Sequence, residues 1–187
     1  MWATNYRTGF HENTLYKILV PETMMEDKDN MWGPAHEIGH INQFAINWPG
    51  CSESSNNLFS NYVIFKFGKF CSRGTALSEL NNYRVVQDQP FTLISGATHQ
   101  GENTELHMRM NWQLFVYFHR VLGDEQFWPR LFKLLRQTPP VESNPGWSQL
   151  NFAEQACAAA NLDLTDFFEM WGFFVPVDNV PYEQYGN

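Results

Sequence analysis

The sequence has few basic residues, and they do not cluster. Its 187 residues include 12 Lys and Arg against 20 Asp and Glu, for a formal net charge of −8 at pH 7. The Lys and Arg residues are isolated from one another along the chain, whereas a nucleic-acid-binding surface needs a basic patch. We therefore expect no nucleic acid among the partners of this protein.

Long apolar runs are also missing. The densest one, from Trp112 to Phe118, contains Gln113 and ends at His119, well short of the roughly 18 residues that span a bilayer. The segment from Met1 to Asn5 has neither the basic nor the apolar region of a signal peptide. We expect no membrane span, and either a cytosolic protein or a chain that lacks its natural start.

Cysteine is scarce and unpaired in sequence. Cys51, Cys71 and Cys157 form no CxxC pair, so a zinc site built from cysteines is not expected. The odd count leaves two interpretations open. Either all three are buried thiols, or one disulfide forms, for which Cys51 and Cys71 are the preferred pair.

Apolar residues make up 43% of the chain and aromatic residues 16%, which suits one compact domain over residues 1–187. Helical spacing and breakers predict helices at 34–46, 52–67, 75–87, 102–122, 124–136, 147–160 and 163–171. Residues 1–20 are predicted to be extended, with a strand at Thr14–Val20, and residues 21–33 to form a loop. The expected fold is mainly α with a short extended or β lead-in.

One five-residue motif points to definite chemistry. His36-Glu37-Ile38-Gly39-His40 fits the pattern HExxH, and residues four apart lie on one face of a helix. His36 and His40 can therefore hold one Zn²⁺ through ring nitrogens. Glu37 can take a proton from the attacking water and pass it to a leaving amine. The motif predicts a zinc-dependent peptidase centre.

A catalytic zinc needs a third protein ligand and one open position. Glu53 follows His40 by 13 residues, beyond a Trp48-Pro49-Gly50 turn that can bring the next helix back. Asn57 lies four residues later on the same helical face, where its amide can accept the N–H of a zinc-bound imidazole. The alternative is that Glu53 is an acidic residue that interacts with a helix N-terminus.

The motif and its surroundings resemble a known family. The run from Trp32 to Gln43 and the stretch Glu53–Ser60 resemble the enhancin-like, family-60 metallopeptidases, and residues 163–172 look like that family's closing helix. The family belongs to the gluzincins. The resemblance therefore implies Zn²⁺ as cofactor, His36, His40 and Glu53 as its ligands, and Glu37 as the catalytic acid and base.

The resemblance also bears on domain organisation. Zinc peptidases of this type place a sheet ahead of the active-site helix. We therefore expect the chain to be the helical C-terminal part of a zincin catalytic domain whose N-terminal, β-containing part lies upstream of Met1.

Known targets of the family include mucins and other O-glycosylated proteins, and its members are typically secreted or displayed on the cell surface. The resemblance thus implies an O-glycosylated protein or peptide as substrate and a secreted or cell-surface location. Candidate substrate contacts are Trp48, Tyr83, Arg84, His107 and Trp112. Candidate donors for the developing oxyanion are Tyr83, His99, His107 and Arg109.

The sequence leaves three functions open. The leading one is an endopeptidase that acts on O-glycosylated proteins. The second is a general gluzincin peptidase or aminopeptidase for unglycosylated peptides. The third is a glycan-binding module or an inert fragment, although a pure binder has no need of the base Glu37. The glycan preference and the oligomeric state are not predicted.

Overall fold

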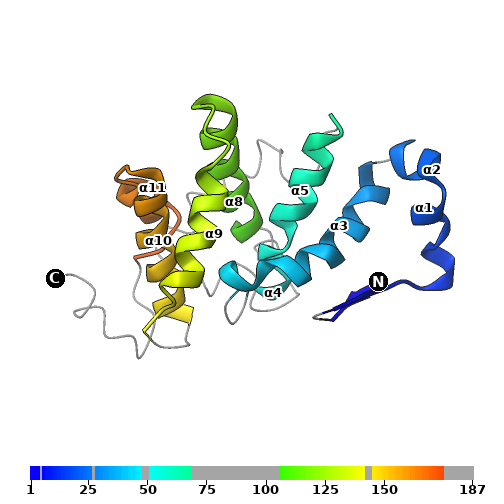
Figure 1. Cartoon of the computed structure of the whole chain (residues 1–187), viewed down its shortest axis with the longest axis horizontal. Helices are drawn as coiled ribbons and strands as arrows, with labels where there is room; N and C mark the ends of the chain where they lie inside the picture. Colours follow the sequence, from blue (N-terminus) through cyan, green and yellow to red (C-terminus); the bar gives the residue numbers. More distant parts are fainter. Residues whose placement is uncertain (5, 27, 48–50, 69–105, 142–144, 175–187) are drawn as a thin grey trace.

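The computed structural model describes residues 1–174 except 5, 27, 48–50, 69–105 and 142–144. Within these residues the fold is mostly helical, with one two-stranded antiparallel sheet near the N-terminus. Figure 1 shows the hairpin and α1–α3 at one end of the molecule and α10 and α11 at the other. The predicted mainly α fold with a short β lead-in is confirmed. In the described ranges, no helix combines the length and the apolar character needed to cross a membrane.

The elements fall into three stretches of chain. The first holds β1 (Trp2–Ala3), β2 (Thr8–Gly9), the 3₁₀ turn η1 (Glu12–Thr14), α1 (Tyr16–Leu19), α2 (Pro21–Glu26) and α3 (Lys28–Asn42). The second holds the 3₁₀ turn η2 (Gln43–Ile46), α4 (Ser52–Ser55) and α5 (Asn57–Lys66). The third holds α8 (Leu106–Phe115), the π-helical η4 (Val116–Val121), α9 (Phe127–Gln137), α10 (Pro145–Ala160) and α11 (Thr165–Met170).

Two elements predicted near the N-terminus are wrong. Thr14–Val20, predicted as a strand, contains the one-turn helix α1, and the loop predicted for residues 21–33 is α2 and the first part of α3. The carbonyl of Leu15 accepts the N–H groups of Ile18 and Leu19 at 3.1 and 2.9 Å. A strand former favours a strand only where a partner strand is present. Here the packing of α1 against α2 and α3 outweighs the local preference for a strand.

The helices predicted after residue 34 are confirmed where the structure describes them, but several are divided. The predicted helix 34–46 is the end of α3 followed by η2, and the helix 52–67 is divided at Asn56 into α4 and α5. The long helix 102–122 becomes α8 and then the π-helical η4. The helix predicted at 75–87 lies outside the described residues.

The main hydrophobic core lies where α5, α8, α9, α10 and α11 meet. Phe127, Leu131 and Leu135 are buried at four-residue spacing on α9, as expected for a helix with one apolar face. Phe118 of η4 stacks on Phe127 with ring centroids 3.8 Å apart. A second buried cluster joins α3 to α5 and α8 and consists of Met31, Trp32, Ile64 and Met108. This second cluster holds α3 against the rest of the molecule.

The described residues do not test the predicted disulfide between Cys51 and Cys71. Cys51 is buried in the main core. Cys157 is a half-buried free thiol whose sulfur accepts the N–H of Leu164 at 3.4 Å. Cys71 lies outside the described residues, so the Cys51–Cys71 pairing stays a prediction.

Gly39 allows α3 to touch the junction between α4 and α5. A Cβ atom added at Gly39 would lie 2.5 Å from the carbonyl oxygen of Asn56 and 3.1 Å from its carbonyl carbon. Any side chain at this position would therefore push the junction away from α3. At Gly33, in the same helix, an added Cβ would meet only the flexible end of the Met1 side chain.

These two glycines give a matched pair of substitutions. We expect Gly39→Ala to lower the free energy of unfolding, because overpacking costs about 1–3 kcal/mol and the better helix propensity of Ala returns only about 1 kcal/mol. Gly33→Ala should leave the free energy of unfolding unchanged or raise it. Urea denaturation followed by circular dichroism measures both. Equal stability of the two variants would contradict the close contact between Gly39 and Asn56.

Candidate metal centre

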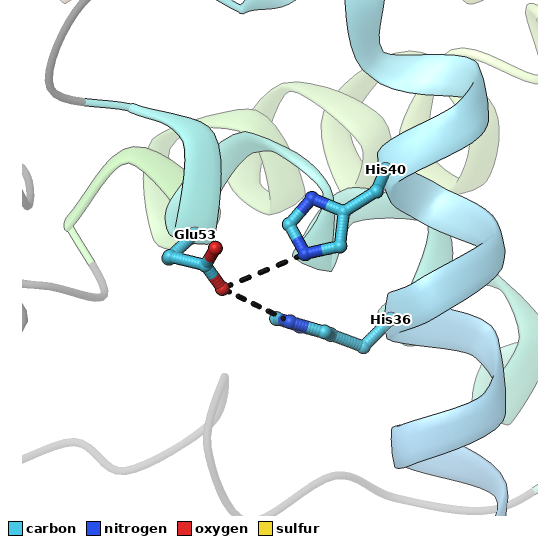
Figure 2. Close-up of side chains that lie close together, drawn as sticks. All are labelled: His36, His40 and Glu53. Carbon is cyan, nitrogen blue, oxygen red and sulfur yellow. Dashed lines mark hydrogen bonds and ion pairs between the residues drawn. The ribbon is translucent and has the colours of Figure 1, made fainter. Parts of the chain in front are cut away.

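Three potential metal ligands converge between α3 and α4. His36 and His40 project from one face of α3, one turn apart, and Glu53 reaches toward them from the first turn of α4 (Figure 2). Glu53 Oε2 lies 3.3 Å from His36 Nε2 and 3.5 Å from His40 Nε2. One carboxylate oxygen thus faces two imidazole nitrogens.

The spacing of these atoms fits a tetrahedral metal site. Ligand atoms at roughly 2.1 Å from a tetrahedral zinc stand about 3.4 Å apart, close to both separations from Glu53. One ligand atom from each of the three residues lies within 4.8 Å of the others. Two imidazoles and a carboxylate are also a donor set that suits zinc. The residues present therefore fit such an ion and leave one coordination position for water or substrate.

Each histidine also contacts a buried side-chain amide through its other ring nitrogen. Asn57 Oδ1 lies 2.7 Å from His36 Nδ1, and Asn57 Nδ2 donates to the carbonyl of Glu53 at 2.9 Å. The side-chain nitrogen of Gln43 lies 2.8 Å from His40 Nδ1. The structure thus brings Asn57 to His36, as its helical spacing from Glu53 suggested. Sequence reasoning missed Gln43, although three residues after His40 is a spacing at which helical side chains meet.

The electrostatics of the site favour a positive charge between the three side chains. Burial opposes protonation of His36, but its hydrogen bonds to Glu53 and Asn57, together with the negative charges of Glu53 and Glu37, outweigh burial and raise the pKa of His36. Hydrogen bonds from His36 and His40 hold the pKa of the Glu53 carboxyl far below its usual range. Glu53 is therefore ionised at neutral pH and offers a negative charge to any cation that binds the imidazoles.

The site opens into a cleft of about 560 Å³. His36, Glu37, His40 and Glu53 line this cleft, together with residues 1–4 of the hairpin and residues of η2 and its flanks. Glu37 is only 6% exposed. The rings of Trp2 and Phe44 also line the cleft and are 47% and 60% exposed. Sequence reasoning missed both rings, because no local pattern indicates that the hairpin packs beside the helix that carries His36 and His40.

Of the predicted substrate contacts, the structure describes His107 and Trp112, and neither is among the described residues that line this cleft. His107 is fully buried, and burial lowers its pKa to about 3, so a substrate contact by His107 is incompatible with the structure. Trp112 stacks on Phe115 with ring centroids 4.7 Å apart and packs against the main core. Arg109 is half-buried on the same helix and is not among the described residues that line the cleft. Trp48, Tyr83, Arg84 and His99 lie outside the described residues.

The fold and this donor set suit a site of the metallopeptidase type. The chain matches the family described as peptidase M60, enhancin and enhancin-like over residues 1–172. It belongs to that family, which confirms the resemblance found in the sequence. A comparison with curated proteins found no match.

Solved structures include similar proteins. One is described as a metallopeptidase in complex with Tn antigen, and another as a metallopeptidase from Bacteroides thetaiotaomicron. Each is 52% identical to this chain with a TM-score of 0.82, and the match covers 95% of this chain but 33% and 30% of theirs. A functionally unknown conserved protein from Bacillus anthracis str. Ames is 28% identical, with a TM-score of 0.68 over 92% of this chain and 33% of its own. The chain spans about a third of the length of these relatives.

Proposed function

We propose that this chain carries the metal centre of a zinc-dependent endopeptidase that hydrolyses peptide bonds in O-glycosylated proteins. The observation that carries the proposal is the approach of Glu53 Oε2 to 3.3 and 3.5 Å from a ring nitrogen of His36 and of His40, in a cleft that Glu37 also lines. Membership of the peptidase M60 family and 52% identity to two metallopeptidases support the class of reaction.

In this proposal His36, His40 and Glu53 hold the ion. The chemistry that zinc supplies at such a site is polarisation of the scissile carbonyl and a lower pKa for the attacking water. Glu37 accepts a proton from that water and passes it to the nitrogen of the leaving amine. Asn57 fixes the ring of His36 through Nδ1, so that Nε2 stays directed at the carboxylate of Glu53.

The substrate class rests on a relative and on the shape of the cleft. The relative in complex with Tn antigen is 52% identical to this chain. The cleft of about 560 Å³ is within the usual size of ligand sites, roughly 300–1,000 Å³. The exposed rings of Trp2 and Phe44 offer apolar faces to a sugar. Because the net charge of −8 does not attract sialylated chains, we expect a preference for short neutral glycans.

A pair of peptides tests this function. One carries a short neutral O-glycan and the other has the same sequence without the glycan. We expect zinc-loaded protein to cleave the glycopeptide at least about tenfold faster, which corresponds to about 1.4 kcal/mol of additional transition-state binding. Mass spectrometry of the products locates the scissile bond, and chelator-treated protein should cleave neither peptide.

Each other outcome favours a different function. Equal cleavage of the two peptides would overturn the glycoprotein assignment and favour a general peptidase. Cleavage of neither peptide by zinc-loaded protein would overturn peptidase activity and favour a glycan-binding module, which calorimetry with the glycopeptide detects, or an inert fragment. A zinc content near zero after dialysis against a weak chelator would overturn the proposed metal centre itself.

A further inference from the structure

We propose that Gln43 and Ser55 position His40 for metal binding through a side-chain amide that can present either its nitrogen or its oxygen. This inference rests on the proposed metal centre. The side-chain nitrogen of Gln43 lies 2.8 Å from His40 Nδ1, and Ser55 Oγ donates to the Gln43 oxygen at 2.6 Å. Gln43 is 3% exposed and Ser55 is fully buried, so bulk water does not compete for these hydrogen bonds.

The direction of the hydrogen bond between Gln43 and His40 sets which imidazole nitrogen carries the proton. The side-chain nitrogen of buried Asn56 also approaches the ring, at 3.1 Å from Nε2 and 3.5 Å from Nδ1, so a metal at Nε2 takes the place of that contact. A neutral imidazole carries one proton, on either Nδ1 or Nε2. When the Gln43 amide donates to Nδ1, the proton lies on Nε2, the atom 3.5 Å from Glu53 Oε2. That tautomer has no lone pair on Nε2 for a metal. When the amide presents its oxygen instead, it accepts Nδ1–H, and Nε2 becomes a ligand.

Ser55 makes both orientations of the amide compatible with the same fold. A hydroxyl group can donate or accept, so Ser55 donates to the amide oxygen in one orientation and accepts from the amide nitrogen in the other. A 180° turn of the amide exchanges the two atoms without moving η2 or α4. Ser55 lies on the same short helix as Glu53. The hydrogen bonds from His40 through Gln43 to Ser55 therefore also connect His40 to the helix that carries the third ligand.

Asn57 provides an informative contrast on the other histidine. Its nitrogen donates to the carbonyl of Glu53 at 2.9 Å, which leaves its oxygen facing His36 Nδ1 at 2.7 Å. A carbonyl oxygen can only accept, so this amide has one favourable orientation. His36 is therefore held in the metal-binding tautomer, whereas His40 adopts that tautomer when the Gln43 amide turns.

The experiment uses two variants of Gln43 and one of Ser55, with zinc affinity as the first readout. Gln43→Met keeps the length of the side chain without a hydrogen bond to the imidazole, and should weaken zinc affinity about 10–100-fold, as loss of a residue that orients a ligand does. Gln43→Glu keeps an oxygen acceptor and should stay within a few-fold of wild type. Ser55→Ala removes the adaptable partner and should have an intermediate effect. Competition with a chromophoric chelator measures all three.

Matched variants calibrate these values. Gln137→Met changes an exposed glutamine at the end of α9 and should leave zinc affinity unchanged. Asn57→Ala removes the corresponding contact to His36 and should also weaken zinc affinity about 10–100-fold. Circular dichroism of every variant separates loss of folding from loss of metal affinity.

A second readout is one that a purely structural role of Gln43 would not change. With zinc bound, ¹H–¹⁵N NMR of labelled histidine should show a slowly exchanging Nδ1–H for His40 in wild type and in Gln43→Glu, and a rapidly exchanging one in Gln43→Met. Wild-type zinc affinity and an intact Nδ1–H signal in Gln43→Met would overturn the proposal. So would an equal loss of affinity in folded Gln43→Met and Gln43→Glu. Wild-type protein that binds no zinc would instead overturn the proposed function.

Discussion

Replacing Glu37 by glutamine should lower turnover by roughly two to four orders of magnitude, the usual contribution of a general acid and base, while zinc stays bound. Glutamine keeps the shape of the side chain but cannot accept a proton from the attacking water. Glu37 lines the cleft beside His36 and is not one of the three converging ligands. We therefore expect the loss to appear in kcat rather than in the zinc content.

The measurement pairs kcat on the glycopeptide with elemental analysis of zinc. Glu154→Gln is the matched control, because Glu154 is an exposed glutamate on α10, away from the cleft. It should keep wild-type turnover and wild-type zinc content. Near-wild-type turnover in Glu37→Gln would show that another group moves the proton, and a parallel loss of zinc would show that Glu37 supports the metal site.

Glu53→Gln should weaken zinc affinity by more than the 10–100-fold expected for a residue that only orients a ligand. The substitution removes the negative charge that faces both imidazoles at 3.3 and 3.5 Å. It also removes the charge that strengthens the hydrogen bond from His36 and, with that bond, raises the pKa of His36 against the effect of burial. The pKa of His36 should therefore be lower in the variant than in wild type.

Two measurements test this second prediction. Chelator competition gives the zinc affinity, and NMR titration of chelator-treated protein gives the pKa of His36. Glu154→Gln again serves as the control for loss of a carboxylate. If Glu53→Gln kept zinc affinity within tenfold of wild type, Glu53 would not be the third ligand, and its interaction with the helix N-terminus would be the better account.

Much of the helical fold could be predicted because it depends on local spacing. The buried positions Phe127, Leu131 and Leu135 repeat at the helical period, and Gly123 stands between the two predicted helices as a residue with positive φ. The N-terminal region was predicted wrongly because Thr14–Val20 is rich in strand formers. Helix α1 forms there because it packs against α2 and α3. The sequence of residues 14–20 alone does not reveal those contacts.

The candidate site also has features that local spacing predicts and features that it does not. Helix geometry alone places His36 and His40 on one face and Asn57 one turn from Glu53. The contacts of Gln43 to Ser55 and of Trp2 to the cleft join segments that are distant in sequence. Sequence spacing does not identify the buried face of α8, so it predicts substrate contacts by His107 and Trp112. The structure instead buries His107 and packs Trp112 on Phe115.

The sequence by itself determined the candidate metal ligands, the pairing of two histidines on one helical turn, and the family. These depend on residue identity and on the fixed geometry of a helix. Only the tertiary structure decided that Glu53 Oε2 lies within 3.5 Å of both imidazoles. That distance depends on the approach of α4 and α5 to α3, which Gly39 permits at Asn56 and the cluster of Met31, Trp32, Ile64 and Met108 maintains. The packing of these helices depends on contacts between residues from several segments of the chain, so no single segment predicts it.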